Sequence, residues 1–426
     1  MHILLIHQAF AALDEPGGTR HYELARCLAQ RGHRVTIIAS PVSYLTGAPP
    51  QPPPFSEKMG GEQGGVTILR TATYHALHRS FVHRVFVFFS FMLSSFVVGL
   101  RVRKVDLVWG TSPPIFQGWT AWVLARLKRV PFLFEVRDLW PAFAIAVGVL
   151  RNRTLIRLSE WLERFLYRHA DRVIVNSPGF IAHVTGVALR EGHSLQSKGR
   201  EAHRVELIPN GAEPGMFDPA DNGEAFRASY RLENKFVVLY AGAHGISNDL
   251  GVVLEAAKIL QDVTVTSKVT ITSGIHIVLL GDGKEKPVLQ HQAAAMGLTN
   301  VLFLPPVPKN EMPAALAGAD ACIAILKPLD EYKTTYPNKV FDYMAAGRPV
   351  VLAIDGVTRE MVEAAECGIF AQPGDPAALA NAIRALASDP ARSRRTGLKG
   401  RRYVEVHFSR SMLAEKLAHI LEEMTT

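Results

Sequence analysis

The sequence predicts an α/β protein with two doubly wound domains, because the chain is long and strand-like and helical segments alternate along both halves. A chain of 426 residues exceeds the size of one ordinary hydrophobic core. Alternating buried strands and amphipathic helices are typical of parallel sheets that carry helices on both faces. We expect a first domain over residues 1–190, a second over residues 205–400, and a C-terminal helix over residues 401–426 with the first domain as its candidate packing partner.

The first half begins with a β–α–β unit. Ile3–His7 is typical of a buried strand, Tyr22–Arg31 has helical periodicity, and Val35–Ala39 predicts the next strand. Residues 47–65 are rich in proline and glycine, which predicts a loop that is either a mobile lid or a solvated insertion. Residues 185–204 are polar and predict the connection between the domains. Three further apolar runs continue the predicted sheet, namely Asp106–Gly110, Phe132–Val136 and Val173–Asn176.

The second half repeats this alternation. Val205–Ile208 predicts a strand that is followed by a Pro-Asn-Gly turn, and Gly251–Gln261 is the clearest helix. A short helix is expected to begin at Pro337, whose missing N–H costs nothing in a first turn, and to end at Gly347, before Pro349. The remaining predicted elements are the strands Val237–Ala241, Ile275–Leu280, Val301–Phe303, Ala321–Ile325 and Val350–Ala353 and the final amphipathic helix Met412–Met424.

The composition indicates a folded protein of a reducing compartment. Hydrophobic residues make up 48% and charged residues 20% of the chain, which excludes a disordered protein. The three cysteines, Cys27, Cys322 and Cys367, have neither disulfide-framework nor metal-site spacing. Residues 1–6 are a short apolar run without a basic leader, so we expect no signal peptide and a cytoplasmic protein.

Positive charge is concentrated in the first half. Residues 1–175 carry 21 Lys and Arg against 11 Asp and Glu, whereas residues 176–426 carry 26 against 28. This asymmetry indicates an anionic partner such as a membrane surface or a phosphate-bearing substrate. Residues 85–100 are uncharged and apolar but too short to span a bilayer. They form either a buried core helix or, within residues 79–104, a monotopic helix that lies on an anionic membrane at its basic flanks.

Polar motifs follow several predicted strands, at the edge where open α/β sheets bind ligands. Gly17-Gly18 lies between the first strand and the first helix, where backbone amides can approach a phosphate. The alternative is an ordinary turn. Arg137 and Asp138 follow the strand that ends at Val136, and they form either part of a cleft or a surface ion pair.

Two glycine-containing loops mark the second domain. Tyr240-Ala-Gly-Ala-His-Gly245 ends its first strand and contains Gly242, which permits close approach of a phosphate. His244 is either a hydrogen-bonding partner of a diphosphate or sugar, or a capping residue. Gly281-Asp-Gly-Lys284 follows the next strand but lacks the GxxxxGK[ST] spacing of an NTPase. The sequence also lacks a DxD motif and a zinc-site Cys/His cluster, so we expect no metal and no cofactor.

Seven motifs follow one another along the chain: Pro16-Gly-Gly-Thr-Arg-His-Tyr-Glu-Leu-Ala25, Arg137-Asp-Leu-Trp-Pro141, Val175-Asn-Ser177, Ile208-Pro-Asn-Gly211, Tyr240-Ala-Gly242, Leu280-Gly-Asp-Gly283 and Pro337–Pro349. In their order and spacing these motifs resemble the family 4 glycosyltransferases, with the closest similarity to the O-antigen fucosaminyltransferase-like subgroup. The resemblance implies the GT-B architecture, in which two facing Rossmann-like domains enclose a cleft. It also implies a retaining, metal-independent transfer of a sugar, of the UDP-N-acetyl type, to a lipid-linked or glycan acceptor in bacterial surface polysaccharide synthesis.

The resemblance also implies roles for individual residues. Asp342 matches the second glutamate of the family's E-x7-E element, which holds the ribose hydroxyls. Thr334 stands eight positions earlier, where the first glutamate would be, and it cannot supply that carboxylate. Arg137 stands where many members have a histidine, whereas Asp138 keeps the acid that follows it.

The basic residues that usually follow the Tyr-Ala-Gly loop are absent, so the diphosphate charge needs another partner. Lys339 is the first candidate and Lys333 the second, with backbone amides of Gly18 and Gly242 as helpers. The predicted catalytic residues are Arg137, Asp138 and His244, and the predicted donor-binding residues are Gly17, Gly18, Gly242, Gly283, Lys333, Thr334, Lys339 and Asp342.

Three other functions stay open at this point. A sugar-nucleotide epimerase of the same architecture would act on the donor without an acceptor. A non-catalytic partner protein would bind the nucleotide sugar without turnover. The charge asymmetry also permits a nucleic-acid-binding protein, but the chain has no recognised nucleic-acid motif, so nucleic acid is not an expected partner.

Overall fold

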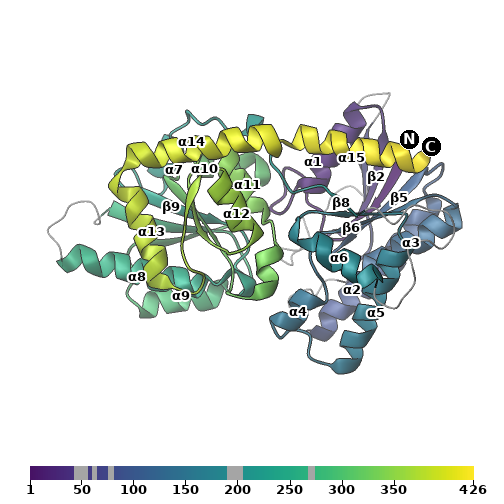
Figure 1. Ribbon diagram of the computed structural model, residues 1–426, viewed down its shortest axis with the longest axis horizontal. Coiled ribbons are helices and arrows are strands. Elements are labelled where there is room, and N and C mark those ends of the chain that lie inside the picture. Colours follow the sequence, from purple (N-terminus) through teal and green to yellow (C-terminus); the bar gives the residue numbers. More distant parts are fainter. Residues whose placement is uncertain (43–55, 60–64, 75–80, 190–204, 267–273) are drawn as a thin grey trace. The chain divides into compact units, whose positions relative to one another are not determined.

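The protein, seen in a computed structural model, forms two compact α/β units (Figure 1). The first unit comprises Met1–Ala12, Gly17–Pro209 and Arg410–Thr426, and the second comprises Leu13–Pro16 and Asn210–Ser409. The structure describes residues 1–42, 56–59, 65–74, 81–189, 205–266 and 274–426.

The described part of the first unit contains an eight-stranded sheet in the order β3-β4-β2-β1-β5-β6-β7-β8. Only β3 runs antiparallel to its neighbour, and the other pairs are parallel. Strand β1 is buried along its whole length between β2 and β5, which explains its continuous apolar sequence. The strands are β1 (His2–Ile6), β2 (Arg34–Ala39), β3 (Ser56–Met59), β4 (Val66–Arg70), β5 (Leu107–Ser112), β6 (Phe132–Val136), β7 (Arg172–Val175) and β8 (Val205–Leu207).

Helices cover this sheet, and one of them comes from the end of the chain. The helices are α1 (Arg20–Gln30), α2 (Phe81–Arg101), α3 (Phe116–Lys128), α4 (Ala142–Ala146), α5 (Arg153–His169), α6 (Gly179–Leu189) and α15 (Arg410–Thr425). Helix α3 packs on β5 and β1, and α2 packs on α3. Helix α15 packs beside α1, where buried Arg410 Nε lies 2.9 Å from Glu23 Oε2.

The second unit contains a parallel sheet whose described strands follow the order β11-β10-β9-β12-β13-β14. Alternate residues of β9 enter two different cores: Leu239 packs on one face with Phe341, and Val238 packs on the other with Leu254. The sheet is therefore doubly wound, as the alternating sequence predicts. The strands are β9 (Phe236–Ala241), β10 (Ile275–Leu280), β11 (Val301–Leu304), β12 (Ala321–Ile325), β13 (Val350–Ala353) and β14 (Gly368–Phe370).

Each face of this sheet has its own helices. Helices α11 and α14 pack together, and α8 and α13 pack together. The α-helices are α7 (Glu224–Ser229), α8 (Leu250–Thr266), α9 (Lys286–Ala295), α10 (Met312–Ala317), α11 (Asn338–Ala345), α12 (Val357–Ala364), α13 (Pro376–Ser388) and α14 (Pro390–His407). The short 3₁₀ helices are η1 (Pro214–Met216), η2 (Ile246–Asn248), η4 (Lys309–Glu311) and η5 (Asp330–Thr334).

The structure confirms the α/β class with two Rossmann-like domains, and it corrects several boundaries. Part of the predicted loop 47–65 is strand β3, and residues 47–55 and 60–64 lie outside the described residues. Part of the predicted connection 185–204 belongs to α6, and residues 190–204 lie outside the described residues. Residues 401–426 are not one helix, because α14 ends at His407 and α15 begins at Arg410.

The apolar run forms helix α2, which is only partly buried. Val87 and Phe91 are buried, whereas Phe89 and Leu93 are 52% and 69% exposed. One side of the helix therefore belongs to the core, as the first interpretation predicts, and the other side is exposed. The membrane interpretation stays a prediction. Among the described helices, none has the length and apolarity needed to cross a membrane.

Candidate active site

Two loops of the second unit lie backbone to backbone at the carboxyl ends of the neighbouring strands β9 and β10. The amide of His244 donates to the carbonyl of Asp282 at 2.8 Å, and the carbonyl of His244 accepts from the amide of Glu285 at 3.0 Å. Gly283 has a φ of +155°, and a Cβ there would lie 2.4 Å from the His244 carbonyl oxygen. Only glycine permits this approach, so the loops form a tight backbone surface of the kind that accepts phosphate.

Lys339 lies at the start of α11 and reaches this surface. A Cβ on Gly242, whose φ is +148°, would lie 2.9 Å from Lys339 Nζ. The ammonium group lies 3.7 Å from the ring centroid of Tyr240, and it has no hydrogen-bond partner among the described residues. Burial lowers the pKa of Lys339 to about 7. The structure therefore places the first diphosphate candidate beside Gly242.

His244 is buried close to the same group. Neither ring nitrogen has a hydrogen-bond partner in the part of the chain that the structure describes. Burial, with smaller contributions from Lys286 and Lys339, lowers the pKa of His244 to about 4. The imidazole is therefore neutral near pH 7, and its two nitrogens are one donor and one acceptor for a ligand. The capping interpretation is not supported for the side chain, because only the backbone of His244 joins the two loops.

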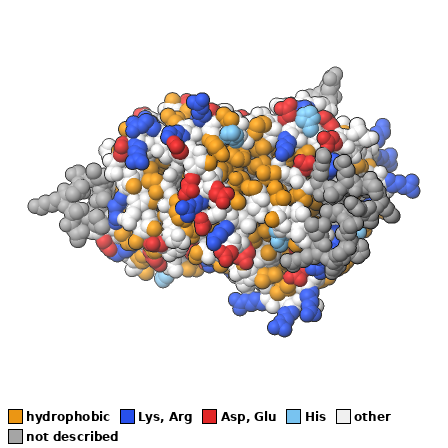
Figure 2. Space-filling view, viewed as in Figure 1, with side chains coloured by type: hydrophobic (Ala, Val, Ile, Leu, Met, Phe, Trp, Pro, Cys, Tyr) orange, Lys and Arg blue, Asp and Glu red, His pale blue; other side chains and the backbone are white. Residues whose placement is uncertain are grey.

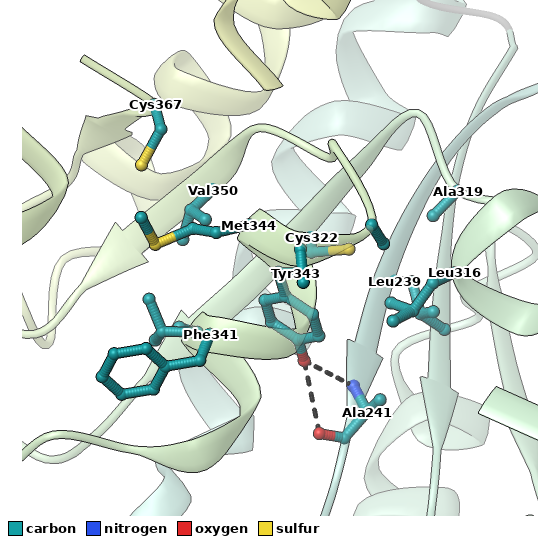
Figure 3. Packing of buried hydrophobic residues seen from close by; sticks show 14 of the residues in the cluster. Leu239, Ala241, Leu316, Ala319, Cys322, Phe341, Tyr343, Met344, Val350 and Cys367 are labelled. Carbon is teal, nitrogen blue, oxygen red and sulfur yellow. Dashed lines mark hydrogen bonds between the residues drawn. The ribbon is translucent and has the colours of Figure 1, made fainter. Parts of the chain in front are cut away.

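A hydrogen bond fixes α11 to the strand that carries the glycine loop. The Tyr343 hydroxyl accepts from the Ala241 amide at 2.9 Å, next to Gly242 (Figure 3). Phe341 and Met344 of the same helix are fully buried in the core below it. The apolar side of α11 thus determines where its polar residues lie, which is the reason that an acid and a base occur within an apolar pattern.

Asp342 forms an ion pair that the sequence did not predict. Its Oδ2 lies 2.6 Å from Nζ of Lys309, a mostly buried lysine of η4. The predicted ribose ligand is therefore not an isolated carboxylate, and a ribose hydroxyl would share it with Lys309. The two residues are 33 positions apart, so no local pattern could have indicated this pair.

Lys333 and Thr334 lie in η5, immediately before the helix. Lys333 is exposed and its Nζ lies 2.7 Å from Asp330 Oδ1, so this second diphosphate candidate is in a solvated ion pair. It lines a pocket of about 130 Å³ at the ends of β12 to β14, together with Asp355 and Gln372. The Thr334 hydroxyl donates to the carbonyl of Glu331 at 2.6 Å, which is a local helix contact.

In the first unit, Arg137 and Asp138 follow β6. Arg137 Nε donates to Thr111 Oγ1 at 3.0 Å and to the Ser112 carbonyl at 3.1 Å, so the guanidinium is directed to the end of β5. Burial raises the pKa of Asp138 to about 7, although the Arg137 charge opposes this shift. Asp138 can therefore exchange a proton near neutral pH, as a general acid or base must.

Gly17 and Gly18 are exposed in the turn before α1. Gly17 has a φ of +150°, and a Cβ there would lie 2.9 Å from the Cβ of Ala11. The helix begins at Arg20, two residues earlier than the sequence predicts. The two glycines thus lie one turn away from the N-terminus of an α-helix, as anion binding by backbone amides requires.

Sequence reasoning missed a buried charge network beside this helix start. Glu135 is fully buried and accepts from Arg20 Nε at 2.9 Å, and its other oxygen lies 2.6 Å from His21 Nε2. Arg20 also donates to the carbonyls of Ile208 and Pro209. The network joins α1, β6 and the end of β8. The available signal was the Thr-Arg-His run directly after the glycines, with a glutamate inside the apolar strand Phe132–Val136.

Across the described ranges, no three or more His, Cys, Asp and Glu side chains gather in a way that could hold a metal ion. The candidate site of the second unit consists of backbone amides, a neutral imidazole and lysine. That arrangement suits an anion.

Two family models match successive parts of the chain. The Glycosyl transferase 4-like domain matches residues 17–211, and Glycosyl transferases group 1 matches residues 235–389. The chain is similar to WcaI of Escherichia coli strain K12, which is named as a colanic acid biosynthesis glycosyl transferase, with 24% identity over 345 residues and 79% of each chain. It is 29% identical over 212 residues to the D-inositol 3-phosphate glycosyltransferase of Streptomyces avermitilis, which covers 48% of this chain and 44% of that protein.

Solved structures share the fold over nearly the whole chain. Sucrose-phosphate synthase from Thermosynechococcus elongatus matches with a TM-score of 0.73 and 20% identity, over 99% of this chain and 98% of that one. HepE of Anabaena in complex with UDP and glucose matches with a TM-score of 0.68 and 17% identity, over 99% of this chain and 100% of that one. WaaG, a glycosyltransferase involved in lipopolysaccharide biosynthesis, matches with a TM-score of 0.68 and 15% identity, over 98% of this chain and 99% of that one. The fold is that of GT-B glycosyltransferases.

Proposed function

Because the chain belongs to the glycosyltransferases that combine a 4-like first domain with a group 1 second domain, we propose that it transfers a sugar from a nucleoside-diphosphate sugar to a lipid-linked or glycan acceptor. The observation that carries this proposal is the anion site of the second unit. The site lies at the ends of β9 and β10, where Lys339 meets the backbone at Gly242 and Gly283. His244 adds two ring nitrogens that have no hydrogen-bond partner among the described residues. A diphosphate supplies the charge and the acceptor oxygens that these groups lack.

The proposed donor is a UDP-sugar of the N-acetylated type. The uridine part is supported by HepE, which has been solved with UDP and glucose. The N-acetylated sugar follows from the family resemblance. Asp342, with Lys309 at 2.6 Å, is proposed to accept the ribose hydroxyls. Thr334 leaves the donor sugar without the usual carboxylate at that position, and its hydroxyl is the only polar group that its side chain offers.

The proposed chemistry is a retaining substitution at the front face of the sugar. The leaving phosphate accepts the acceptor's proton, and Lys339 together with loop amides stabilises the charge that develops on the nucleoside diphosphate. His244 donates or accepts a hydrogen bond at the same end of the donor. Asp138, whose pKa is raised to about 7, and Arg137 are proposed to act on the acceptor side.

The proposed biological setting is the synthesis of a bacterial surface polysaccharide, such as O-antigen. WcaI is named for colanic acid biosynthesis and WaaG for lipopolysaccharide biosynthesis, and both names describe envelope glycans. We place the enzyme in the cytoplasm, peripherally bound to the inner face of the plasma membrane. The acceptor would then be reached at the surface where lipid-linked glycans are assembled.

Helix α2 supports the membrane part of this proposal. Its exposed side chains recur at the spacing of one helix side and end beside the exposed charges of Arg101, Arg103 and Lys104. Those exposed side chains are Phe86 (60%), Phe89 (52%), Leu93 (69%), Val97 (41%) and Leu100 (45%). An apolar stripe with basic residues at its end fits anionic lipid.

Helix α5 extends the same kind of surface. It exposes Leu158 and Trp161 beside Arg157, and ring contacts connect it to α2 through α3. Phe116 of α3 lies 5.7 Å from Phe89, and Trp119, one turn further along α3, lies 6.2 Å from Trp161. Lys and Arg side chains gather near hydrophobic ones at the lower edge of the first unit in Figure 2, where α4 and α5 lie in Figure 1.

Product analysis tests the transfer. Candidate UDP-sugars are incubated with and without bacterial lipid-linked acceptors, and the products are separated by mass spectrometry. Acceptor-dependent glycan supports the proposal. Epimerised or hydrolysed donor without acceptor would instead identify an epimerase-like enzyme, and nucleotide binding without any turnover would identify a non-catalytic partner.

Liposome flotation tests the membrane surface. The protein is expected to float with vesicles rich in phosphatidylglycerol at low salt, and a Phe89→Ser, Leu93→Ser double variant is expected to stay at the bottom of the gradient. Leu398→Ser is the matched control, because Leu398 is 44% exposed on α14 of the second unit. Equal flotation of all three proteins, or none by the native protein, would end the idea.

A further inference from the structure

Among the described residues, Lys339 differs from two other lysines of the second unit, Lys309 and Lys286, in that its Nζ has no polar partner. Lys309 pairs with Asp342, and Lys286 Nζ donates to the carbonyls of Gly281 and Leu304 at 2.7 and 2.9 Å. Lys339 Nζ has no hydrogen-bond partner in the part of the chain that is described, and only the Tyr240 ring faces it closely. Buried charges are rarely left so, because desolvation penalises an unpaired ion.

The ring of Tyr240 is fixed in place. Its hydroxyl donates to the carbonyl of Ala243 at 2.7 Å, and the side chain is buried at the end of β9. The face of an aromatic ring attracts a cation electrostatically and does not take up its N–H donors in ordinary hydrogen bonds. Tyr240 can therefore hold Lys339 near Gly242 while the N–H donors of the ammonium group remain available to a ligand.

The neighbouring titratable groups do not supply the missing charge. His244 is neutral near pH 7 because burial lowers its pKa to about 4. Asp282 Oδ1 accepts from the Gly283 amide at 2.8 Å, and the carboxylate of Asp342 is 2.6 Å from Lys309. Tyr240 on β9 lies against the Lys339 amine. His244 interacts electrostatically with Lys339 and also with Asp282 and Lys286, which follow β10. Asp342, on the same helix as Lys339, is paired with Lys309 of η4.

We propose that Tyr240 is a positioning residue that holds the Lys339 amine without a counter-ion, and that a nucleoside diphosphate enters the site together with one proton. The proton comes from solvent and forms an N–H bond on Nζ, and the phosphate remains ionised. The inference rests on the proposed donor class. It adds that the free enzyme keeps this amine largely neutral above pH 7 and that the bound diphosphate makes it an ammonium.

The electrostatics agree with this geometry. Burial lowers the pKa of Lys339 to about 7 in the free protein, and a phosphate within hydrogen-bond distance raises it again. At pH 8 about nine-tenths of the free amine is then neutral, so binding takes up close to one proton. His244 contributes little at this pH, because its pKa must rise from about 4 before it gains a proton.

Isothermal titration calorimetry with UDP tests the proposal. Titrations at pH 8 in phosphate-free buffers of different ionisation enthalpy give the number of protons taken up. UDP itself is fully ionised there, because its terminal phosphate titrates near pH 6. We expect about one proton per UDP, and a Kd that rises about tenfold per pH unit above about pH 7.5.

Three variants separate positioning from a merely structural role. Tyr240→Phe keeps the ring and is expected to retain proton uptake and the native pH profile. Tyr240→Leu removes the ring, so the amine loses its proton more easily. The Kd for UDP is therefore expected to begin to rise at a lower pH than in the native protein. Lys339→Met is expected to bind UDP at least tenfold more weakly at pH 7 and without pH dependence. Far-UV circular dichroism checks that each variant is folded.

The outcomes distinguish the proton-linked binding inferred here from the proposed donor class. If the native protein binds UDP with no proton uptake, or if Lys339→Met keeps the pH dependence, the inference is wrong while the donor class stands. If Tyr240→Leu matches the native profile, Tyr240 does not position the amine. If no nucleoside diphosphate binds at any pH, the proposed function fails and the inference fails with it. Should Lys339→Met not fold, the native proton count and the two Tyr240 variants still decide.

Discussion

Lys339→Met is expected to stabilise the second unit at neutral pH, although it removes a proposed donor ligand. Burial lowers the pKa of Lys339 from an ordinary value of 10.5 to about 7. Since each pKa unit is worth about 1.4 kcal/mol, keeping the ammonium there costs at most about 5 kcal/mol of folding free energy. Methionine of similar length, packed against the Tyr240 ring that lies 3.7 Å from Nζ, should therefore raise the free energy of unfolding at pH 7 by up to about 5 kcal/mol.

The increase in the free energy of unfolding that Lys339→Met produces must depend on pH in a defined direction. Below pH 7 the lysine is protonated in both the folded and unfolded protein, so the native protein bears the whole cost. As pH rises from about 7 to 10.5, the unfolded chain holds more protons than the folded one, and the stability of the native protein increases. The advantage of Lys339→Met is therefore greatest at pH 7 and below, and it decreases toward zero near pH 10.5.

Urea unfolding can measure the second unit separately. All five tryptophans lie between Trp109 and Trp161, in the first unit, so tryptophan fluorescence follows that unit alone. Far-UV circular dichroism follows both, and the difference reports the second unit. Lys258→Met is the control, because Lys258 forms an exposed ion pair with Asp262 at 3.0 Å and should change stability by less than about 0.5 kcal/mol. Destabilisation by Lys339→Met, or an equal gain at pH 7 and pH 9.5, would refute the reasoning.

Three other changes have expected outcomes. Glu135→Gln leaves the buried Arg20 without its counter-charge and should destabilise the first unit by about 3–5 kcal/mol in the fluorescence transition; an unchanged midpoint would contradict the network. Asp138→Asn should lower kcat strongly. In the native protein, the raised pKa of Asp138 lowers the stability of the first unit as pH rises from about 4 to 7, and the Asn variant should lack this loss. Near-normal turnover of the variant would exclude Asp138 from catalysis. Asp342→Ala should raise the donor KM about tenfold or more, and a change confined to kcat would argue against ribose binding.

Most strands of both sheets could be predicted, because a buried parallel strand is a continuous apolar run. Residues 350–353 and 132–136 were recognised in this way, with bounds that match the structure. Strands β3, β4 and β14 were not predicted. Ser56–Met59 lies within the proline- and glycine-rich run that predicts a loop, Val66–Arg70 mixes polar and apolar residues, and Gly368–Phe370 is only three residues long.

The candidate site could be predicted only where a local motif carries it. Gly242 and Gly283 stand out in sequence because glycine follows a strand, and Lys339 because it begins a helix with capping signals. The partners of these residues come from other elements. Lys309 pairs with Asp342 across 33 residues, and Glu135 pairs with Arg20 across 115. Such pairs depend on side-chain packing between elements, which no residue spacing encodes.

The sequence by itself determined the α/β class, the two domains and the strand ends at which we propose a ligand site, because periodicity and glycine placement act over a few residues. The tertiary structure decided which charges are paired. It joins Asp342 to Lys309 and Glu135 to Arg20. It leaves Lys339 against the ring of Tyr240, without a hydrogen-bond partner among the described residues. The physical reason is that desolvation and pairing are set by neighbours distant in the chain, and these set the charge that a site presents to its ligand.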